Sequence, residues 1–103
     1  MKIWLDDVRC PPNHDWVWVV SVNDAKRWID YYETDLKPNG ETLELSLDHD
    51  LGEYAYDGGD GIKLMDWLAE RGTTYPVELH TMNPVGRDNM VRMIKRYWSK
   101  KNG

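Results

Sequence analysis

Apolar and polar residues alternate in several short stretches of the chain, a pattern typical of half-buried β-strands. Leu43, Leu45 and Leu47 alternate in this way, and so do Ile3 and Leu5 near the N-terminus. The pattern predicts strands over residues 2–5, 16–20, 42–47 and 77–81. The intervening positions are polar or aromatic, which indicates a sheet with one buried face and one wet or half-covered face.

Helical spacing of apolar residues follows the second, third and fourth predicted strands. The first helix is predicted over residues 21–34, with Ser21 or Asn23 as its N-cap. The second is predicted over residues 61–71, and the third begins after Asn83 and runs to about Trp98. The resulting order β, β, α, β, α, β, α predicts a small α/β fold with helical crossovers.

Three connecting segments have a less regular pattern. Two prolines between the first two strands forbid a regular helix there, and the link is short for a crossover. Either an irregular loop joins parallel strands, or the second strand runs antiparallel. Residues 53–61 are acidic and glycine-rich and predict a mobile loop over the site, in which Asp57 and Asp60 are candidate ligands. An N-cap role for Asp60 is favoured over ligation, and residues 100–103 are predicted to be a solvated tail.

Length and charge limit the class of protein. A chain of 103 residues is predicted to form one domain over residues 1–103. Its net charge of −5 argues against general nucleic-acid binding, which depends on cationic contacts to phosphates, but a small phosphorylated ligand is compatible with it. The single Cys10 excludes an internal disulfide, and no apolar run is long enough for a membrane span. We therefore expect a soluble cytoplasmic protein.

Carboxylates follow two of the predicted strands. Asp6 and Asp7 come directly after the first strand, and Asp48 and Asp50 follow the third. The carboxyl ends of parallel strands meet at one edge of a sheet, so these acids are expected to lie close together and to need a cation. Oxygen ligands favour Mg²⁺, with Mn²⁺ or zinc favoured only if a histidine also binds. A purely structural role stays open for Asp50.

Histidines and phosphate-binding residue types lie near the same edge. His49 and His80 are candidates for general acid and base catalysis because imidazole titrates near neutral pH. A structural role for His80, which is placed within the fourth strand, is an equal alternative. The start of the last helix, Asn83-Pro84, predicts an anion site through its free N–H groups. The candidate phosphate-binding residues are Arg9, Thr81, Asn83 and Arg87, although for Asn83 a role purely as the helix cap is at least an equal alternative.

The chain resembles the receiver superfamily, and within it the cyclic-phosphate-processing receiver-like domain. The resemblance rests on three segments: Trp4-Leu5-Asp6-Asp7-Val8-Arg9, Ser46-Leu47-Asp48-His49-Asp50-Leu51-Gly52, and His80-Thr81-Met82-Asn83-Pro84-Val85-Gly86-Arg87. It implies a flavodoxin-like, mostly parallel four-stranded sheet in the order 2-1-3-4 with about three helices. It also implies Mg²⁺ at the acidic strand ends and processing of cyclic or terminal phosphates on nucleotides or RNA.

The chain departs from an ordinary receiver in ways that matter for function. A proline-rich segment replaces the first helix, and the fifth strand, its phosphate-pairing lysine and the fifth helix are missing. These losses argue against signalling through an aspartyl phosphate, although Arg87 is a candidate substitute for the lysine. They also leave one sheet face without helices, so we expect Trp4 and a tryptophan of strand two to be partly exposed or to form a homodimer contact.

The combined expectation is metal-dependent hydrolysis of a cyclic phosphate or phosphodiester in a nucleotide or RNA. In this interpretation Asp6, Asp7 and Asp48 hold the cation, with Asp50 as a further candidate, while Asp48, His49 and His80 are the catalytic group. The partner is a small phosphorylated ligand such as a cyclic nucleotide or an RNA end. The alternatives are a module that sequesters a cyclic nucleotide without cleaving it, and a receiver relic that acts through protein contacts.

Overall fold

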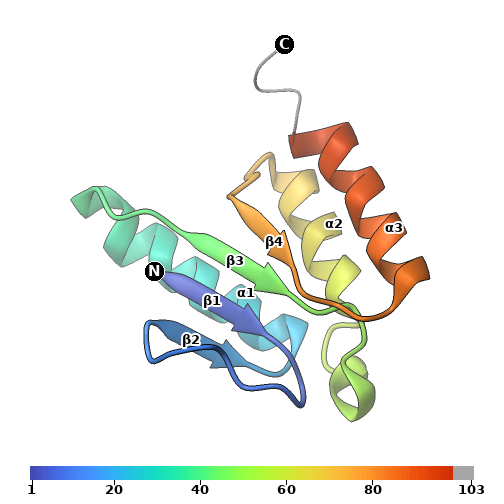
Figure 1. Ribbon diagram of the computed structural model, residues 1–103. Helices are drawn as coiled ribbons and strands as arrows, with labels where there is room; N and C mark the ends of the chain where they lie inside the picture. The colour runs from blue at the N-terminus through green and yellow to red at the C-terminus, as the bar shows by residue number, and fades with distance from the viewer. Residues whose placement is uncertain (99–103) are drawn as a thin grey trace.

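The sheet has four parallel strands in the order β2-β1-β3-β4. A computed structural model describes residues 1–98 (Figure 1). The predicted tail of residues 100–103 therefore lies outside the described residues. The strands are β1 (Lys2–Leu5), β2 (Trp16–Val19), β3 (Glu44–Leu47) and β4 (Val77–Leu79). The expected α/β class and strand order are confirmed.

β2 runs parallel to β1, which settles the alternative left open by the sequence. Lys2 is opposite Trp16 and Leu5 is opposite Val19. The link between them is irregular, as Pro11 and Pro12 require. A parallel pair is thus formed without a helical crossover, and the proline-rich link runs from the carboxyl end of β1 back to the amino end of β2.

Three α-helices follow the strands as predicted, although their ends differ. They are α1 (Val22–Tyr31), α2 (Gly61–Arg71) and α3 (Pro84–Met93). Two of them continue into wide π-type turns, over Tyr32–Leu36 and Ile94–Trp98, and short 3₁₀ turns cover Lys37–Asn39 and Gly52–Tyr56. The side chain of Ser21 accepts a hydrogen bond from Asp24 N and so caps α1, as one of the two expected candidates.

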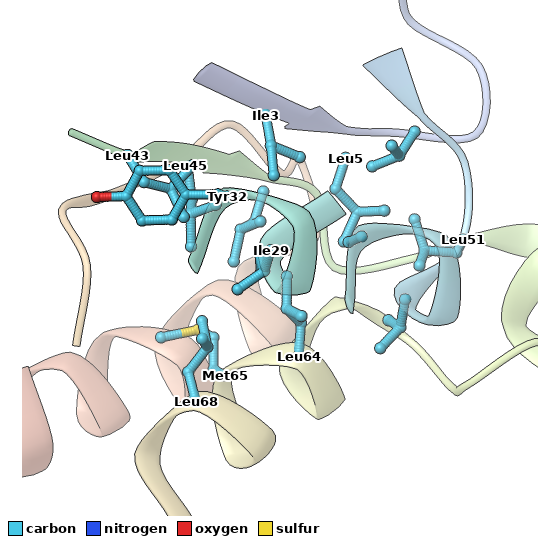
Figure 2. Close-up of a cluster of buried hydrophobic side chains, with 14 of the residues drawn as sticks. Ile3, Leu5, Ile29, Tyr32, Leu43, Leu45, Leu51, Leu64, Met65 and Leu68 are labelled. Carbon is cyan, nitrogen blue, oxygen red and sulfur yellow. The ribbon is translucent and has the colours of Figure 1, made fainter. Parts of the chain in front are cut away.

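The hydrophobic core lies on one face of the sheet, beneath the helices (Figure 2). The strand positions with the predicted parity are fully buried at Ile3, Leu5, Leu45 and Leu47. All three helices contribute to the same cluster, with Val22, Ala25, Ile29, Leu64, Met65, Leu68 and Met90. Within the described chain, none of the helices is long and apolar enough to cross a bilayer.

The opposite face of the sheet carries aromatic and polar side chains. Trp4 and Trp16 are partly exposed, Trp18 is 45% exposed, and Ser46 is buried between the strands. α3 packs beside α2 on the core side, so within residues 1–98 it leaves these tryptophans uncovered (Figure 1). The expectation of a half-covered face is confirmed for residues 1–98, while the homodimer stays a prediction.

The loop before α2, which was predicted to be mobile, is tied to the start of α1 by several hydrogen bonds. Asp57 accepts hydrogen bonds from Ser21 Oγ at 2.7 Å and Asn23 Nδ2 at 3.1 Å, and its carbonyl accepts one from Asn23 N. Asp60 stands at the N-cap position of α2 but its side chain does not cap the helix; it accepts a hydrogen bond from Leu51 N instead. The predicted capping role of Asp60 is therefore wrong, because the loop turns its carboxylate back toward Leu51.

Candidate active site

Three carboxylates, which we call the acid centre, meet at the carboxyl ends of β1 and β3. Asp6 and Asp7 follow β1, and Asp48 follows β3. One oxygen from each lies within 4.8 Å of the others, and Asp6 and Asp48 are buried. The parallel pairing of β1 with β3 explains this convergence, because both strands end at the same edge.

Asp6 is held by several donors. Its Oδ1 accepts hydrogen bonds from Val8 N and Arg9 N, each at 2.9 Å, and its Oδ2 contacts Arg9 Nε at 3.2 Å and His80 Nε2 at 3.0 Å. Burial opposes ionisation, but these hydrogen bonds and the Arg9 charge outweigh it and lower the pKa of Asp6. Asp6 is therefore an anion at neutral pH.

In Asp48 the effects that raise the pKa outweigh those that lower it, the reverse of Asp6. Burial and the nearby charge of Asp6 raise the pKa of Asp48, although hydrogen bonds from Thr81 and His49 N act against the rise. Arg9 Nη2 lies 3.6 Å from Asp48 Oδ1. Within residues 1–98, Arg9 is the only Lys or Arg side chain that pairs with the acid centre. Arg9 thus pairs with two of the three carboxylates, which leaves an excess of negative charge.

The tip of β3 is packed tightly against the start of α2. Gly61 N donates to His49 O at 2.7 Å, and a Cβ at Gly61 would lie 1.9 Å from Asp48 O. Only glycine fits this approach, so Gly61 fixes the backbone that presents Asp48 and His49.

His80 lies directly after β4, not within it as the sequence suggested, because β4 ends at Leu79. Both of its ring nitrogens have partners: Nε2 contacts Asp6 Oδ2, and Nδ1 lies 2.8 Å from Ser46 Oγ. A carboxylate only accepts hydrogen bonds, so Nε2 carries the proton and Nδ1 accepts from the Ser46 hydroxyl. The ring stacks on Trp4 at 3.8 Å with planes 7° apart. Burial lowers the pKa of His80 despite its contact with Asp6, so the ring is neutral at neutral pH.

His49 has a different arrangement. Its Nδ1 lies 2.8 Å from Asp50 Oδ1, and the hydrogen bond with His49 lowers the pKa of Asp50. The ionised Asp50 can only accept, so Nδ1 carries a proton, and in the neutral tautomer Nε2 is the acceptor. A Cβ at Gly86 would meet the ring at 2.4 Å, so the absence of a side chain there lets the imidazole pack against α3. Within residues 1–98, Nε2 makes no hydrogen bond with another side chain.

The start of α3 is closed to anions, contrary to expectation. Asn83 Oδ1 accepts from Val85 N and Gly86 N, each at 3.1 Å, and Arg87 N donates to Asn83 O. Pro84 has no N–H. Every N–H of this first turn therefore has a partner, and Asn83 acts as the helix cap, the alternative that the sequence left open, so the predicted anion site has no free N–H here.

One of three comparisons with known proteins found a match. The family model described as the cyclic-phosphate processing receiver domain matches residues 1–96. The chain belongs to this family. No curated protein and no solved structure matches it. The family's description associates this receiver-like fold with cyclic-phosphate processing.

The remaining predicted site residues of this receiver domain are only partly brought together. Thr81 contacts Asp48, and its Oγ1 accepts from Asn83 N. Asn83 Nδ2 donates to both oxygens of Asp50, at 3.2 and 3.1 Å. Asp50 is therefore outside the acid centre, because His49 and Asn83 engage its carboxylate. Arg87 Nη1 donates to Leu79 O at 3.2 Å, which places it at the end of β4.

Two site residues escaped the sequence analysis as contributors to the chemistry. Ser46 was only a polar residue on the wet face, and Trp4 only a tryptophan expected to be partly exposed. In the structure Ser46 is 1% exposed and fixes the His80 tautomer, while Trp4 supports the ring. The available signal was the shared parity of Trp4, Ser46 and His80, which places all three on one face of neighbouring strands.

Proposed function

We propose that the domain binds the cyclic phosphate or phosphodiester group of a nucleotide or RNA end at the acid centre and hydrolyses one ester bond with the help of a divalent cation. The observation that supports this most is the meeting of Asp6, Asp7 and Asp48 within 4.8 Å, with a single guanidinium beside them. A phosphate is itself an anion, so a cation is needed before it can approach this edge.

The donor set fits Mg²⁺. The three residues offer carboxylate oxygens, which Mg²⁺ prefers, and the same set accepts Mn²⁺. The raised pKa of Asp48, caused by burial and by Asp6, is the sign of charge that lacks sufficient compensation. When bound, such a cation polarises the phosphoryl oxygens and offsets the negative charge that develops during bond cleavage.

Proton transfer is assigned to His49. In hydrolysis the oxygen of one water bonds to phosphorus, one phosphorus–oxygen ester bond breaks, and the leaving ribose oxygen takes up a proton. His49 Nε2 accepts the proton of the attacking water and then supplies the proton to the leaving oxygen. Asp50 holds the opposite nitrogen at 2.8 Å and so orients the imidazole.

His80 serves as a positioning residue in this scheme. Its Nε2 proton is committed to Asp6 and its Nδ1 lone pair to Ser46. His80 was predicted to act as a general acid or base; with both ring nitrogens engaged, we propose instead that it holds Asp6 in place. Arg9 contacts both Asp6 and Asp48 while its side chain is 44% exposed, so its guanidinium is placed to meet phosphate oxygens.

The test is turnover of 2′,3′-cyclic and 3′,5′-cyclic nucleotides by the full chain with Mg²⁺. We expect His49→Ala to lower kcat by about 10²–10⁴-fold, and Asp48→Ala to remove both turnover and Mg²⁺ dependence. Asp30→Ala, an exposed acid on α1, is the matched control and keeps full activity.

Other results would favour the alternatives. Stoichiometric uptake of nucleotide without product would indicate sequestration. If neither Mg²⁺ nor any nucleotide shifts the melting temperature, the interpretation as a receiver relic would replace the enzyme, because a ligand selective for the folded state must stabilise it.

A further inference from the structure

A groove on the open face of the sheet lies directly beside the acid centre. We call it the Trp4 groove; it is lined by Trp4, Val8, Arg9, Cys10, Pro12 and His80. Its volume of about 460 Å³ is in the range of small-molecule binding sites.

The groove and the acid centre share two walls. Arg9 Nε and His80 Nε2 both contact Asp6 Oδ2, at 3.2 and 3.0 Å respectively. A phosphate bound at the acid centre is therefore one side chain away from the groove. The rest of a phosphorylated ligand has this apolar space next to it.

The walls favour a flat aromatic ligand. The His80 ring stacks on Trp4 at 3.8 Å, so one face of each ring is already covered and a base would stack on the opposite side of this pair; Trp16 meets Trp4 edge-on at 5.8 Å. Trp4 Nε1 donates to Arg9 O at 2.8 Å, which fixes the plane of the indole. Fixed aromatic rings and a guanidinium are the surfaces on which bases stack in single-stranded nucleic-acid sites. Val8, 75% exposed at the rim, adds an apolar contact.

We propose that the Trp4 groove binds the nucleobase of the nucleotide whose phosphate lies at the acid centre. The inference rests on the proposed function and sharpens it, because it gives the base of the proposed nucleotide a binding site of its own and disfavours the cyclic phosphate of a polyol such as inositol. Such a polyol has no planar ring to stack on these walls.

A second groove extends the first toward β2. It has a volume of about 430 Å³ and is lined by Cys10, Pro11, Pro12, Asn13, His14, Trp16 and Trp18. The two grooves share Cys10 and Pro12. The base of a neighbouring nucleotide in an RNA end would lie here, whereas a free nucleotide would leave this groove unused.

The test compares ligands with and without a base, by calorimetry on the full chain with Mg²⁺. The probes are adenosine 2′,3′-cyclic phosphate and the 2′,3′-cyclic phosphate of 1-O-methylribose. We expect the adenosine form to bind at least about fivefold more tightly, the lower limit for one base stacked on an aromatic side chain.

Two variants change the groove and leave the acid centre intact. Cys10→Trp fills the groove from an exposed position, so the affinity ratio of the two probes should fall to about one while the base-free probe binds as before. Val8→Ser should reduce the ratio severalfold. Val85→Ser removes a similarly exposed apolar side chain outside the groove and should leave the ratio unchanged.

The outcomes separate this inference from the proposed function. Equal binding of the two probes to the wild-type chain overturns the nucleobase groove and leaves the acid centre as a phosphate site. If neither probe binds, both proposals fall. A trinucleotide with a terminal 2′,3′-cyclic phosphate distinguishes an RNA end from a free nucleotide as the natural ligand. If it binds more tightly than the mononucleotide and Trp18→Ala abolishes the gain, the ligand is an RNA end. If it binds no more tightly, the ligand is a free nucleotide.

Discussion

Glu33 and Asp48 are both poorly exposed carboxylates at opposite ends of the sheet. Glu33, in the turn after α1, receives hydrogen bonds from the guanidinium of Arg71 and the hydroxyl of Tyr75, just before β4. Asp48, just past β3, lies beside Asp6 and Asp7 and shares Arg9 with Asp6. Burial disfavours ionisation at both sites. The donors around Glu33 outweigh it and lower the pKa of Glu33, whereas burial and Asp6 raise the pKa of Asp48.

The difference teaches how to distinguish a structural acid from a functional one in this fold. Glu33 joins the end of α1 to the end of α2 and has its charge compensated by the protein itself. The acid centre is not compensated in this way, and a bound cation of the kind proposed above would lower its free energy. The contacts of Glu33 thus stabilise the fold, whereas those of Asp48 leave charge that a ligand could compensate.

The largest expected effect is a rise in stability on adding Mg²⁺. Binding to the folded state at 1,000 times the dissociation constant adds about 4.1 kcal/mol to the free energy of unfolding. Thermal unfolding of the wild-type chain should show this rise, and Asp48→Asn should lose most of it. Equal shifts in the two proteins would place the cation away from the acid centre.

Removing the charge of Glu33 is expected to destabilise the fold. Glu33→Gln weakens two hydrogen bonds to a charged group and leaves Arg71 without its anion, so the free energy of unfolding should fall by about 1.5–3 kcal/mol. Urea unfolding measures the loss. Glu53→Gln, an exposed acid in the loop before α2, should change stability by less than about 0.5 kcal/mol. A loss as small as that of Glu53→Gln would contradict the structural role of Glu33.

Removing the charge of Asp48 in the metal-free protein is expected to raise the free energy of unfolding, the opposite of the effect at Glu33. Asp48→Asn relieves repulsion from Asp6, so the metal-free protein should gain about 0.5–2 kcal/mol, the usual range for an optimised charge. Urea unfolding in the presence of a chelator is the measurement. A destabilised Asp48→Asn would mean that Arg9 and Thr81 already compensate the acid centre.

The smallest effects are the changes of these differences with pH. The folded-state pKa of Glu33 is below 4.5, so its stabilisation is complete above pH 4.5 and is lost as the pH falls through the folded value. The folded-state pKa of Asp48 is above 3.8, so its cost is present above the folded value and disappears as the pH falls to 3.8. At neutral pH the free energy of unfolding should be lower than that of the wild type for Glu33→Gln and higher for Asp48→Asn. Both differences should shrink toward zero as the pH falls. If the free energies of unfolding of both variants instead ran parallel to that of the wild type across this pH range, the contrast between Glu33 and Asp48 would be ruled out.

Much of the fold was predictable because it depends on local pattern. The alternation of Leu43, Leu45 and Leu47 defined the buried face, and the acids after β1 and β3 converge because parallel strands end together. The asymmetry of the two sheet faces followed from the same alternation. The resemblance supplied the strand order, which periodicity does not determine.

The side-chain network was not predictable, since it joins residues far apart in the chain. Ser46 and His80 are 34 positions apart, and Asp6 and His80 are 74 apart. Asp50 and Asn83 each looked like a ligand by residue type, but in the structure each satisfies the other. Whether a polar group faces a ligand or a neighbour depends on side-chain directions that only the folded chain defines.

The contact between the loop before α2 and the start of α1 makes one backbone amide a reporter. Asn23 N donates to Asp57 O at 3.1 Å, so its hydrogen exchanges with solvent only when this contact opens. The loop also contains Asp60, which accepts a hydrogen bond from Leu51 N. Deuterium uptake at Asn23 would therefore measure how often this loop separates from α1, in a protein that has not been altered.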